Sequence, residues 1–481
     1  MNLDAFTAIG LVIHWLLAIG LSLRVITRRA PIGVSMAWIA VMFSVPLLGA
    51  GAYLLVGEKR FGRGRVARMA AGAEVLTHWR DDPSREPIAG AHLSAEARPI
   101  AAMAEHVFGF PPEPGNELVL HDTADAFFDA LIDDIDASRR SCHLAFYIWH
   151  DAGRVRDVVD ALIRAAQRGV HCRALGDALG SNAFLHGQAI ARLRAAGIPF
   201  QAALPTGWAR SLWSRVDLRN HRKIVVIDGR VAYTGSQNLV DPRFFMQDAG
   251  AGEWVDAMVR LTGPAVRRLD SVFGHDWTVE TGQPVQPWEA TVSDGITMPG
   301  SPIQVAPSGP GARPQALQQL LLTAIYASRR ELMVTTPYFV PDDSILLALC
   351  SAAQRGVETT LIIPAHNDSR LVRFASSAQF DDLLSAGVGI ALFRGGLLHT
   401  KSITIDGAIS FFGSVNLDMR SLWLNFEISL VVYDDEFTRR LRALQRRYLS
   451  DSERMDLAVW RRRPRWRRLV EDAVRLLGPV L

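Results

Sequence analysis

Two long apolar segments dominate the beginning of the chain, one over residues 5–23 and the other over residues 32–56. Because a helix rises about 1.5 Å per residue, each segment is long enough to cross roughly 30 Å of hydrocarbon. A cleaved secretory signal is disfavoured, since no basic residues precede the first segment and a second apolar segment follows it. The pattern predicts a multi-pass membrane anchor made of two transmembrane helices.

Positive charge around these segments predicts their orientation. Basic residues lie in the short connection and, in greater number, after the second segment: Arg24, Arg28, Arg29, then Lys59, Arg60, Arg63, Arg65 and Arg68. The heavier charge after the second segment favours a cytoplasmic location for the rest of the chain. His14 is an ionisable group inside the first segment, and we interpret it as a neutral imidazole hydrogen-bonded within the hairpin.

Beyond residue 115 the chain repeats a pattern of buried strands and amphipathic helices. The letters AAQRGV occur at residues 165–170 and again at 352–357, and ASRR occurs at 137–140 and again at 327–330. Strands that alternate with helices of ten or more residues indicate βαβ units. The predicted fold is α/β, with two duplicated domains whose mixed or parallel sheets form a pseudodimer around a site at their interface.

This pattern also predicts the limits of the parts. We expect the anchor over 1–60, a juxtamembrane linker over 61–115, the duplicated domains over 116–290 and 291–450, and a basic amphipathic tail over 451–481.

Composition narrows the class of partner. The 481 residues carry a net charge of only +3, so whole-protein attraction to nucleic acid is not expected. Cys142, Cys172 and Cys350 are far apart in sequence, which argues against a disulfide framework or a thiolate zinc site.

One motif occurs twice, at equivalent places in the two repeats. It has the form H-x-K-x4-D-x6-G-S-x-N, and its members are His221, Lys223, Asp228, Ser236 and Asn238 in the first copy and His399, Lys401, Asp406, Ser414 and Asn416 in the second. Residues i and i+2 of a strand share a face, so each His and its Lys are expected to project together. The Asp-Gly pairs predict hairpin turns that bring each Gly-Ser-x-Asn back beside them.

The paired motif suits a phosphodiester. Two ammonium groups can bind the non-bridging oxygens, one imidazole can attack phosphorus and the other can protonate the leaving oxygen. Two alternatives are weaker: solvated polar faces of ordinary hairpins, because two copies match, and a metal site, because each cluster holds a lysine that would repel a cation. We expect no metal and no cofactor.

The motif resembles the paired HKD motif of the phospholipase D superfamily, over residues 116–435. The resemblance implies that His221 is the nucleophile and His399 the general acid and base. It also implies that Lys223, Lys401, Asn238 and Asn416 bind phosphate, helped by Ser236 and Ser414. Asp228 and Asp406 complete the motif but are expected to stabilise the hairpins more than to act in catalysis.

Members of this superfamily also place a carboxylate downstream of each motif to hold the histidine ring. Glu253 and Glu427 occupy such places, 32 and 28 residues after their histidines. An acid that accepts the Nδ1 proton fixes the tautomer and stabilises the imidazolium. Solvated strand charges are the alternative interpretation.

Three features select a lipid synthase within the superfamily. The second motif continues as NLDMRS and then LNFE at residues 416–427, which resembles bacterial cardiolipin synthases, as do the paired apolar segments and the basic aromatic tail. The tail combines Trp460 and Trp466 with several arginines before an apolar stripe ending in Leu476 and Leu477, which suits an anionic membrane surface. The loop over 208–215, with Trp208 and Trp213, is a weaker candidate for the same surface.

The resemblance therefore implies a phosphatidyltransferase that joins two phosphatidylglycerol molecules into cardiolipin and glycerol, without a nucleotide, at a bacterial inner membrane. The partners expected are phosphatidylglycerol, other anionic phospholipids and the bilayer, and no nucleic acid. A hydrolytic phospholipase D and a transferase that uses phosphatidylethanolamine remain alternatives, and a nuclease is a weaker one.

Overall fold

The computed structural model describes residues 3–28, 32–45, 47–58, 61–80, 93–205, 215, 217–285, 300–310 and 315–475. Three expectations lie outside the described residues: most of the loop over 208–215, the boundary at 290, and the apolar end of the tail at Leu476 and Leu477. The chain forms two compact units, residues 1–66 with 206–218 and residues 67–205 with 219–481.

The first unit contains the apolar segments as helices of unequal length. The first segment forms α1 (Leu3–Thr27), of which Ile9–Thr27 is long and apolar enough to cross a membrane. The second forms α2 (Ile32–Ser44), α3 (Leu48–Ala52) and the π-helical turn η1 (Tyr53–Gly57), all shorter. The predicted continuous helix over 32–56 is therefore wrong. Pro46 lacks a backbone N–H donor, and Leu47 has a φ of 60°, which an α-helix does not accommodate.

Hydrogen bonds connect the helices of this unit. The backbone N–H of Leu47 donates to Nδ1 of His14 at 3.4 Å, which confirms that this imidazole is hydrogen-bonded within the anchor. Glu58 accepts hydrogen bonds from Nε of Arg24 at 2.5 Å and from the Tyr53 hydroxyl at 2.7 Å. The buried carboxylate thereby joins the end of α1 to the end of η1, and its charge is compensated.

The second unit is built on one mixed sheet of fifteen strands, in the order β19-β13-β12-β10-β15-β16-β18-β9-β1-β8-β6-β5-β2-β3-β4. In the first half the strands are β1 (Glu113–His121), β2 (Ser141–Phe146), β3 (His171–Asp177), β4 (Phe200–Ala203), β5 (Ile224–Ile227), β6 (Val231–Gly235) and β8 (Met258–Thr262). In the second half they are β9 (Ser301–Ser308), β10 (Glu331–Thr335), β12 (Glu358–Pro364), β13 (Gly389–Phe393), β15 (Ser402–Ile405), β16 (Ile409–Gly413), β18 (Glu427–Val432) and β19 (Ser452–Arg454).

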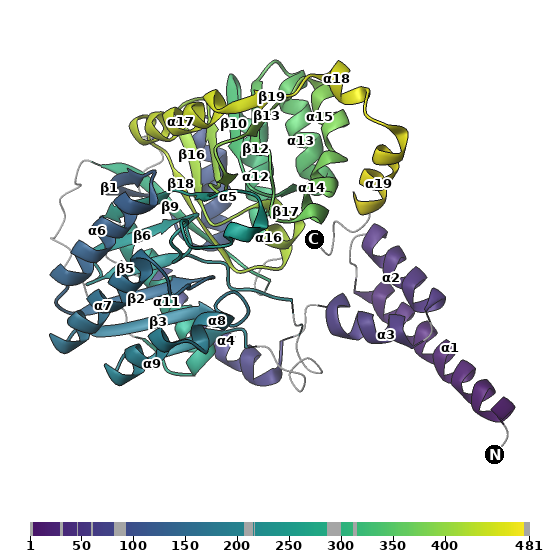
Figure 1. Ribbon diagram of the computed structural model, residues 1–481, viewed down its shortest axis with the longest axis horizontal. Helices are drawn as coiled ribbons and strands as arrows, with labels where there is room; N and C mark the ends of the chain where they lie inside the picture. The colour runs from purple at the N-terminus through teal and green to yellow at the C-terminus, as the bar shows by residue number, and fades with distance from the viewer. Residues whose placement is uncertain are drawn as a thin grey trace. The chain divides into compact units, whose positions relative to one another are not determined.

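The strand order reveals the duplication. Read outward from the antiparallel pair β1–β9, each half has the same sequence of neighbours, with β8, β6, β5, β2, β3 and β4 matching β18, β16, β15, β10, β12 and β13. The two halves thus share one sheet, and the fold is the expected duplicated mixed α/β pseudodimer (Figure 1).

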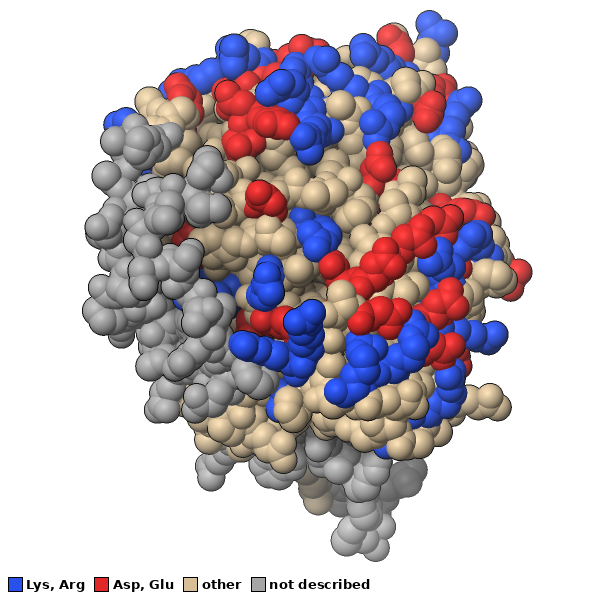
Figure 2. Space-filling view, turned by 90° about the vertical axis from the view of Figure 1, so that its left-hand side faces the viewer, with Lys and Arg blue, Asp and Glu red and all other residues tan. Residues whose placement is uncertain are grey.

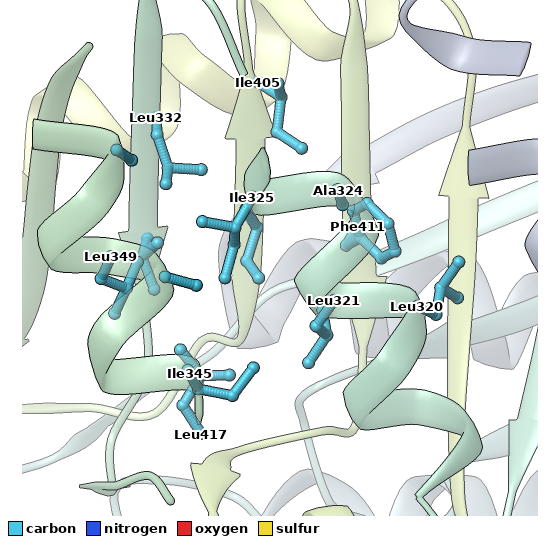
Figure 3. Close-up of a cluster of buried hydrophobic side chains, with 14 of the residues drawn as sticks. Leu320, Leu321, Ala324, Ile325, Leu332, Ile345, Leu349, Ile405, Phe411 and Leu417 are labelled. Carbon is cyan, nitrogen blue, oxygen red and sulfur yellow. The ribbon is translucent and has the colours of Figure 1, made fainter. Parts of the chain in front are cut away.

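Helices pack against this sheet, and most of them contribute apolar side chains to its cores. The first half uses α6 (Ala124–Ala137), α7 (Arg154–Gln167), α8 (Asn182–Leu185), α9 (Gln188–Ala195) and α11 (Ala265–Thr281). The second uses α12 (Ala316–Ala327), α13 (Asp343–Gln354), α14 (Arg370–Ser377), α15 (Phe380–Ala386), α16 (Met419–Trp423) and α17 (Asp435–Ser450). Leu321 and Ile325 of α12 and Leu349 of α13 pack onto Ile405 and Phe411 of the sheet, as Figure 3 shows.

The region 61–115 differs from the expected linker. It contains α4 (Arg63–Arg80) and α5 (Ala97–Phe108), and Ile100 and Ala104 of α5 are fully buried in the core of the second half. Gln304 of β9 also donates to the carbonyl of Ala101 at 3.1 Å. The segment after residue 93 is therefore part of the folded second unit. The core of the second half includes α5, although this helix precedes the first half in sequence.

Candidate active site

The two motif histidines precede equivalent central strands. His221 lies shortly before β5, and His399 lies between the short strand β14 (Leu397–Leu398) and β15. Each lysine folds back on its own histidine: Lys223 donates to the carbonyl of His221 at 2.8 Å, and Lys401 donates to the carbonyl of His399 at 2.6 Å. These interactions fix both ammonium groups beside the imidazoles in a buried environment.

Each histidine ring is held by a carboxylate from the other half. Nδ1 of His221 lies 3.0 and 2.9 Å from the two carboxylate oxygens of Glu427, and Nδ1 of His399 lies 2.8 Å from Oδ1 of Asp256. An ionised carboxylate only accepts hydrogen bonds, so Nδ1 is the donor in both pairs. Nε2 of each imidazole therefore carries the lone pair available to a substrate.

Backbone pairing enforces this crossed arrangement. The N–H of His221 donates to the carbonyl of Phe426 at 2.9 Å, and the N–H of His399 donates to the carbonyl of Val255 at 2.8 Å. Phe426 and Val255 immediately precede Glu427 and Asp256. The same crossing appears in the parallel pairing of β14 with β7 (Trp254–Val255). The two halves meet through main-chain hydrogen bonds at the site itself.

The expectation for Glu253 is wrong. Its side chain is exposed, whereas Asp256, three residues later, is buried and bonded to His399. The first half carries a longer stretch between the motif serine and the carboxylate, so counting from the histidine selects the wrong acid. Matching the following strands, β8 and β18, would have placed Asp256 opposite Glu427.

The motif serines support these carboxylates. Ser236 donates to Oδ1 of Asp256 and Ser414 donates to Oε2 of Glu427, both at 2.5 Å. Each hydroxyl also accepts a backbone N–H, from Ala257 at 3.1 Å and from Ile428 at 3.0 Å. Their hydrogen bonds are thus directed at the carboxylates and the neighbouring backbone.

The motif asparagines have polar atoms to offer a ligand. Oδ1 of Asn238 accepts the backbone N–H of Ile148 at 3.2 Å. Among the residues that the structure describes, Nδ2 of Asn238 and Oδ1 of Asn416 are buried without a hydrogen-bond partner. A buried polar atom without a partner is costly in free energy, so these amides are suited to a bound polar group such as a phosphodiester.

The motif aspartates lie in the hairpin turns. Asp228 has a φ of 53° and Asp406 a φ of 54°. The carboxylate of Asp228 accepts backbone N–H groups from Arg139, Arg140 and Ser141 at 2.7–2.9 Å. Asp406 accepts the same three bonds from residues 329–331. Their oxygens tie the hairpins to the start of β2 and β10, which is the hairpin-stabilising contact expected of these residues.

Burial and charge set the protonation of the site. Desolvation lowers the pKa of His221 to about 4 and that of His399 to about 3, although the facing carboxylates oppose the shift. Burial lowers the pKa of Lys401 to about 7, and burial with the charge of Lys401 lowers the pKa of Lys223 well below its ordinary value. The crossed contacts of His221 with Glu427 and of His399 with Asp256 bring the two motifs to one centre, where the two buried lysines favour an anion.

Aromatic rings line the imidazoles. The ring of Tyr147 meets His221 edge-on at 5.1 Å between centroids, and that of Trp254 lies 4.2 Å from His399. Tyr338 contacts His399 more distantly, at 6.5 Å, and donates to Asp368. Tyr147 and Tyr338, which follow the equivalent strands β2 and β10, were not expected at the site from the sequence.

Charged residues elsewhere are interspersed. On the face drawn in Figure 2, Lys and Arg lie beside Asp and Glu. In the first half, for example, Arg154 forms an ion pair with Asp129 and Arg164 forms one with Asp136. Among the residues described on this face, no continuous basic stripe of the kind that tracks a nucleic-acid backbone is seen. Among the described residues, no three His, Cys, Asp or Glu side chains gather as a metal site.

Comparison with known proteins identifies the family. The model described as "Cardiolipin synthase, PLD-like domain" matches residues 131–277 and 321–448, which contain both motifs. The chain belongs to this family of phospholipase-D-like cardiolipin synthases. A second model, "Phospholipase_D-nuclease N-terminal", matches residues 16–58 of the anchor. Family membership makes the chain a phosphatidyltransferase with phospholipid substrates.

Individual relatives agree. Cardiolipin synthase A of Yersinia pseudotuberculosis serotype O:3 (strain YPIII) is 44% identical over 97% of both chains. Cardiolipin synthase A of Yersinia pestis has the same identity and coverage. The crystal structure of phosphatidylserine synthase from Haemophilus influenzae Rd KW20 matches with a TM-score of 0.59 at 14% identity, over 80% of this chain and 100% of that one. That likeness shows a shared fold.

Proposed function

We propose that this protein is a bacterial cardiolipin synthase that transfers a phosphatidyl group from one phosphatidylglycerol to another through a phosphohistidine. The observation that carries the reaction type is the pair of buried histidines, each held by a carboxylate of the opposite half beside a lysine. The extent of identity to cardiolipin synthase A supports the substrate.

The first step is attack by Nε2 of His221 on phosphorus. The low pKa of His221, about 4, leaves this nitrogen unprotonated at neutral pH. As the P–N bond forms, the ring becomes cationic, and Glu427 stabilises that charge through Nδ1. Lys223 and Lys401 stabilise the charge on the non-bridging oxygens, with the amides of Asn238 and Asn416 beside them.

His399 donates a proton to the leaving alcohol and accepts a proton from the attacking alcohol. A phosphodiester anion at the site raises the pKa of His399, because its negative charge offsets the neighbouring lysines. The protonated ring donates to glycerol as the P–O bond breaks. It then accepts the proton from the hydroxyl of a second phosphatidylglycerol, which attacks the phosphohistidine to give cardiolipin. One phosphodiester replaces another, so the balance requires no nucleotide.

We also propose that α1 spans the inner membrane, that the broken second segment returns to the same face, and that the second unit lies on the cytoplasmic side. The length and apolar character of Ile9–Thr27 and the basic residues after the anchor support this topology.

The deciding experiment supplies purified full-length protein with phosphatidylglycerol labelled in its head group, in mixed micelles free of nucleotide and added metal. We expect labelled glycerol and cardiolipin in equal amounts. Phosphatidic acid as the main product would instead identify a hydrolase. Turnover only after phosphatidylethanolamine is added would identify that lipid as the co-substrate.

A further inference from the structure

In the last described helix, the apolar face is exposed and an acidic side chain on the opposite side is buried. In α19 (Arg465–Arg475), Trp466, Leu469 and Val470 are 67%, 71% and 38% exposed, whereas Glu471 is fully buried. Residues at i, i+3 and i+4 form one stripe of a helix, so the apolar stripe of α19 faces outward. A surface helix of a soluble protein turns its apolar stripe toward the core.

Ion pairs hold α19 in this orientation. Glu471 accepts hydrogen bonds from Nε of Arg463 at 2.8 Å and from Nε of Arg467 at 3.1 Å. Arg463 also donates to Asp381 of α15 at 2.6 Å and lies over the ring of Trp460 in α18 (Leu457–Arg461), 4.2 Å from its centroid. The charged side of the helix is thus fastened to the body, which leaves the apolar side uncovered by the described part of the second unit.

The surroundings of the stripe are basic. Residues 457–475 contain seven arginines and two acidic residues, one of which is the buried Glu471. In Figure 1, α19 lies beside α14, with which it packs. The exposed residues of α14 include Leu371, 48% exposed, and two further arginines, Arg370 and Arg373. An apolar stripe bordered by arginine matches the interface of an anionic bilayer.

This surface is also connected to the active site through a residue close to the start of α14. Asp368, two residues before α14, accepts the hydroxyl of Tyr338, whose ring contacts His399. A bilayer that contacts α14 and α19 would therefore meet an element that is linked to His399 through Asp368 and Tyr338.

We propose that the outward face of α19, with the exposed part of α14, is a second membrane-contact site that takes anionic phospholipid and is distinct from the N-terminal anchor. Trp466, Leu469 and Val470 enter the interfacial layer, and the arginines bind the phosphate groups around them. The proposal does not depend on which lipid is the substrate, so its test needs no turnover.

The test uses the full-length protein in nanodiscs, with Cys350 replaced by alanine because Cys142 and Cys172 are buried. A nitrobenzoxadiazole probe is placed at Leu469→Cys or, as the control, at Arg440→Cys on α17, whose side chain is 56% exposed. The nanodiscs contain phosphatidylcholine, with or without about a third phosphatidylglycerol, and spin-labelled acyl chains as quenchers.

We expect the fluorescence of the probe at position 469 to fall by about half or more in anionic nanodiscs, and less without phosphatidylglycerol. The probe at position 440 should not respond. Equal, weak quenching at both positions would overturn the proposal. An apolar environment at position 469 that persists in detergent, without quenching by lipid, would show that protein covers the stripe and would also overturn it.

A second measurement tests whether this membrane-contact site affects the activity of the enzyme. The double variant Trp466→Asp/Leu469→Asp should lose about tenfold of its activity in phosphatidylglycerol nanodiscs but stay within about twofold of the wild type in detergent micelles. The matched control is Arg439→Gln/Arg440→Gln, which alters exposed residues of α17. Unchanged activity of the aspartate variant in nanodiscs would contradict the proposal, whereas loss in both media would indicate misfolding and is checked by thermal unfolding.

Discussion

The two halves of the body carry the same motif in unlike surroundings. Glu427 contacts His221 with both oxygens and also accepts from Asn425, whereas Asp256 contacts His399 with Oδ1 alone. Among the described residues, Oδ2 of Asp256 is buried without a partner. His221 is 8% exposed and His399 2%.

This difference suggests how two copies of the same motif can take different parts in one reaction. A nucleophile must keep one orientation and bear a full positive charge in the intermediate, and a carboxylate that engages it with both oxygens serves that need. A general acid must exchange its proton in each half-reaction, and a single hydrogen bond leaves its ring less constrained.

The largest effect is expected from removing each histidine. Both His221→Ala and His399→Ala should lower transfer by at least about a thousandfold, since the two act as a unit. They differ with a phosphatidyl ester of p-nitrophenol, whose leaving group needs no protonation. His399→Ala should then form a covalent adduct carrying the lipid phosphate, detected by intact-protein mass spectrometry, and His221→Ala should not. Adduct on His221→Ala alone would reverse the roles.

Removing the supporting carboxylates should cost less. We expect Glu427→Gln and Asp256→Asn each to lower kcat by about a hundredfold, because the imidazole loses its tautomeric and electrostatic support. The nitrophenyl ester should rescue Asp256→Asn more than Glu427→Gln. Glu253→Gln is the matched control and should stay within about twofold of the wild type. A large loss in that variant would restore Glu253 as a positioning residue.

The pH dependence should reveal Lys401. Because its pKa is about 7 in the free protein, its ammonium group is present below that pH and is lost above it. The plot of kcat/KM should therefore fall above about pH 7, while that of kcat falls at higher pH because the bound anion raises the pKa. The variant Lys401→Arg keeps a positive charge at this position. Its kcat/KM should therefore no longer fall near pH 7, although its overall rate should be lower than that of the wild type. A flat kcat/KM profile from about pH 7 to 9 in the wild type would contradict this assignment.

The smallest effect on chemistry is expected at the hairpin turns. Asp228→Ala removes an acceptor of three backbone N–H groups and places alanine at positive φ, so the free energy of unfolding should fall by about 1–3 kcal/mol. Activity per folded molecule should stay within about twofold, and Asp406→Ala should behave alike. Denaturant unfolding and a kinetic assay measure the two quantities. A stable but inactive Asp228→Ala would make that carboxylate catalytic.

Much of the fold follows from local patterns in the sequence. The duplication, the order of strands and helices and the convergence of the motifs were readable because repeated letters and hairpin turns are local features. The broken second apolar segment was missed, because its length and hydropathy suggested one span although Pro46 stands in its interior. The role of α5 was missed because its apolar face packs against residues more than two hundred positions later.

The crossed contacts were beyond local patterns for a related reason. Sequence spacing identified a histidine and a nearby acid in each half, but it does not say that Glu427 serves His221 across 206 residues or that Asp256 serves His399 across 143. Only the pairing of β14 with β7 and of Asn220 with Phe426 decides which acid meets which ring. The error at Glu253 has a different origin, because the stretch between Ser236 and the carboxylate is longer than the one between Ser414 and Glu427.

The crossed arrangement has a consequence for biosynthesis. A ribosome adds about 5–20 residues per second, so the 206 residues that separate His221 from Glu427 correspond to about 10–40 s of translation. During this interval the nascent chain already possesses its anchor and its first motif, yet His221 lacks the carboxylate that holds its ring. A half-made enzyme held at a phospholipid surface is thus unable to cleave the lipids around it until the second half has emerged and paired.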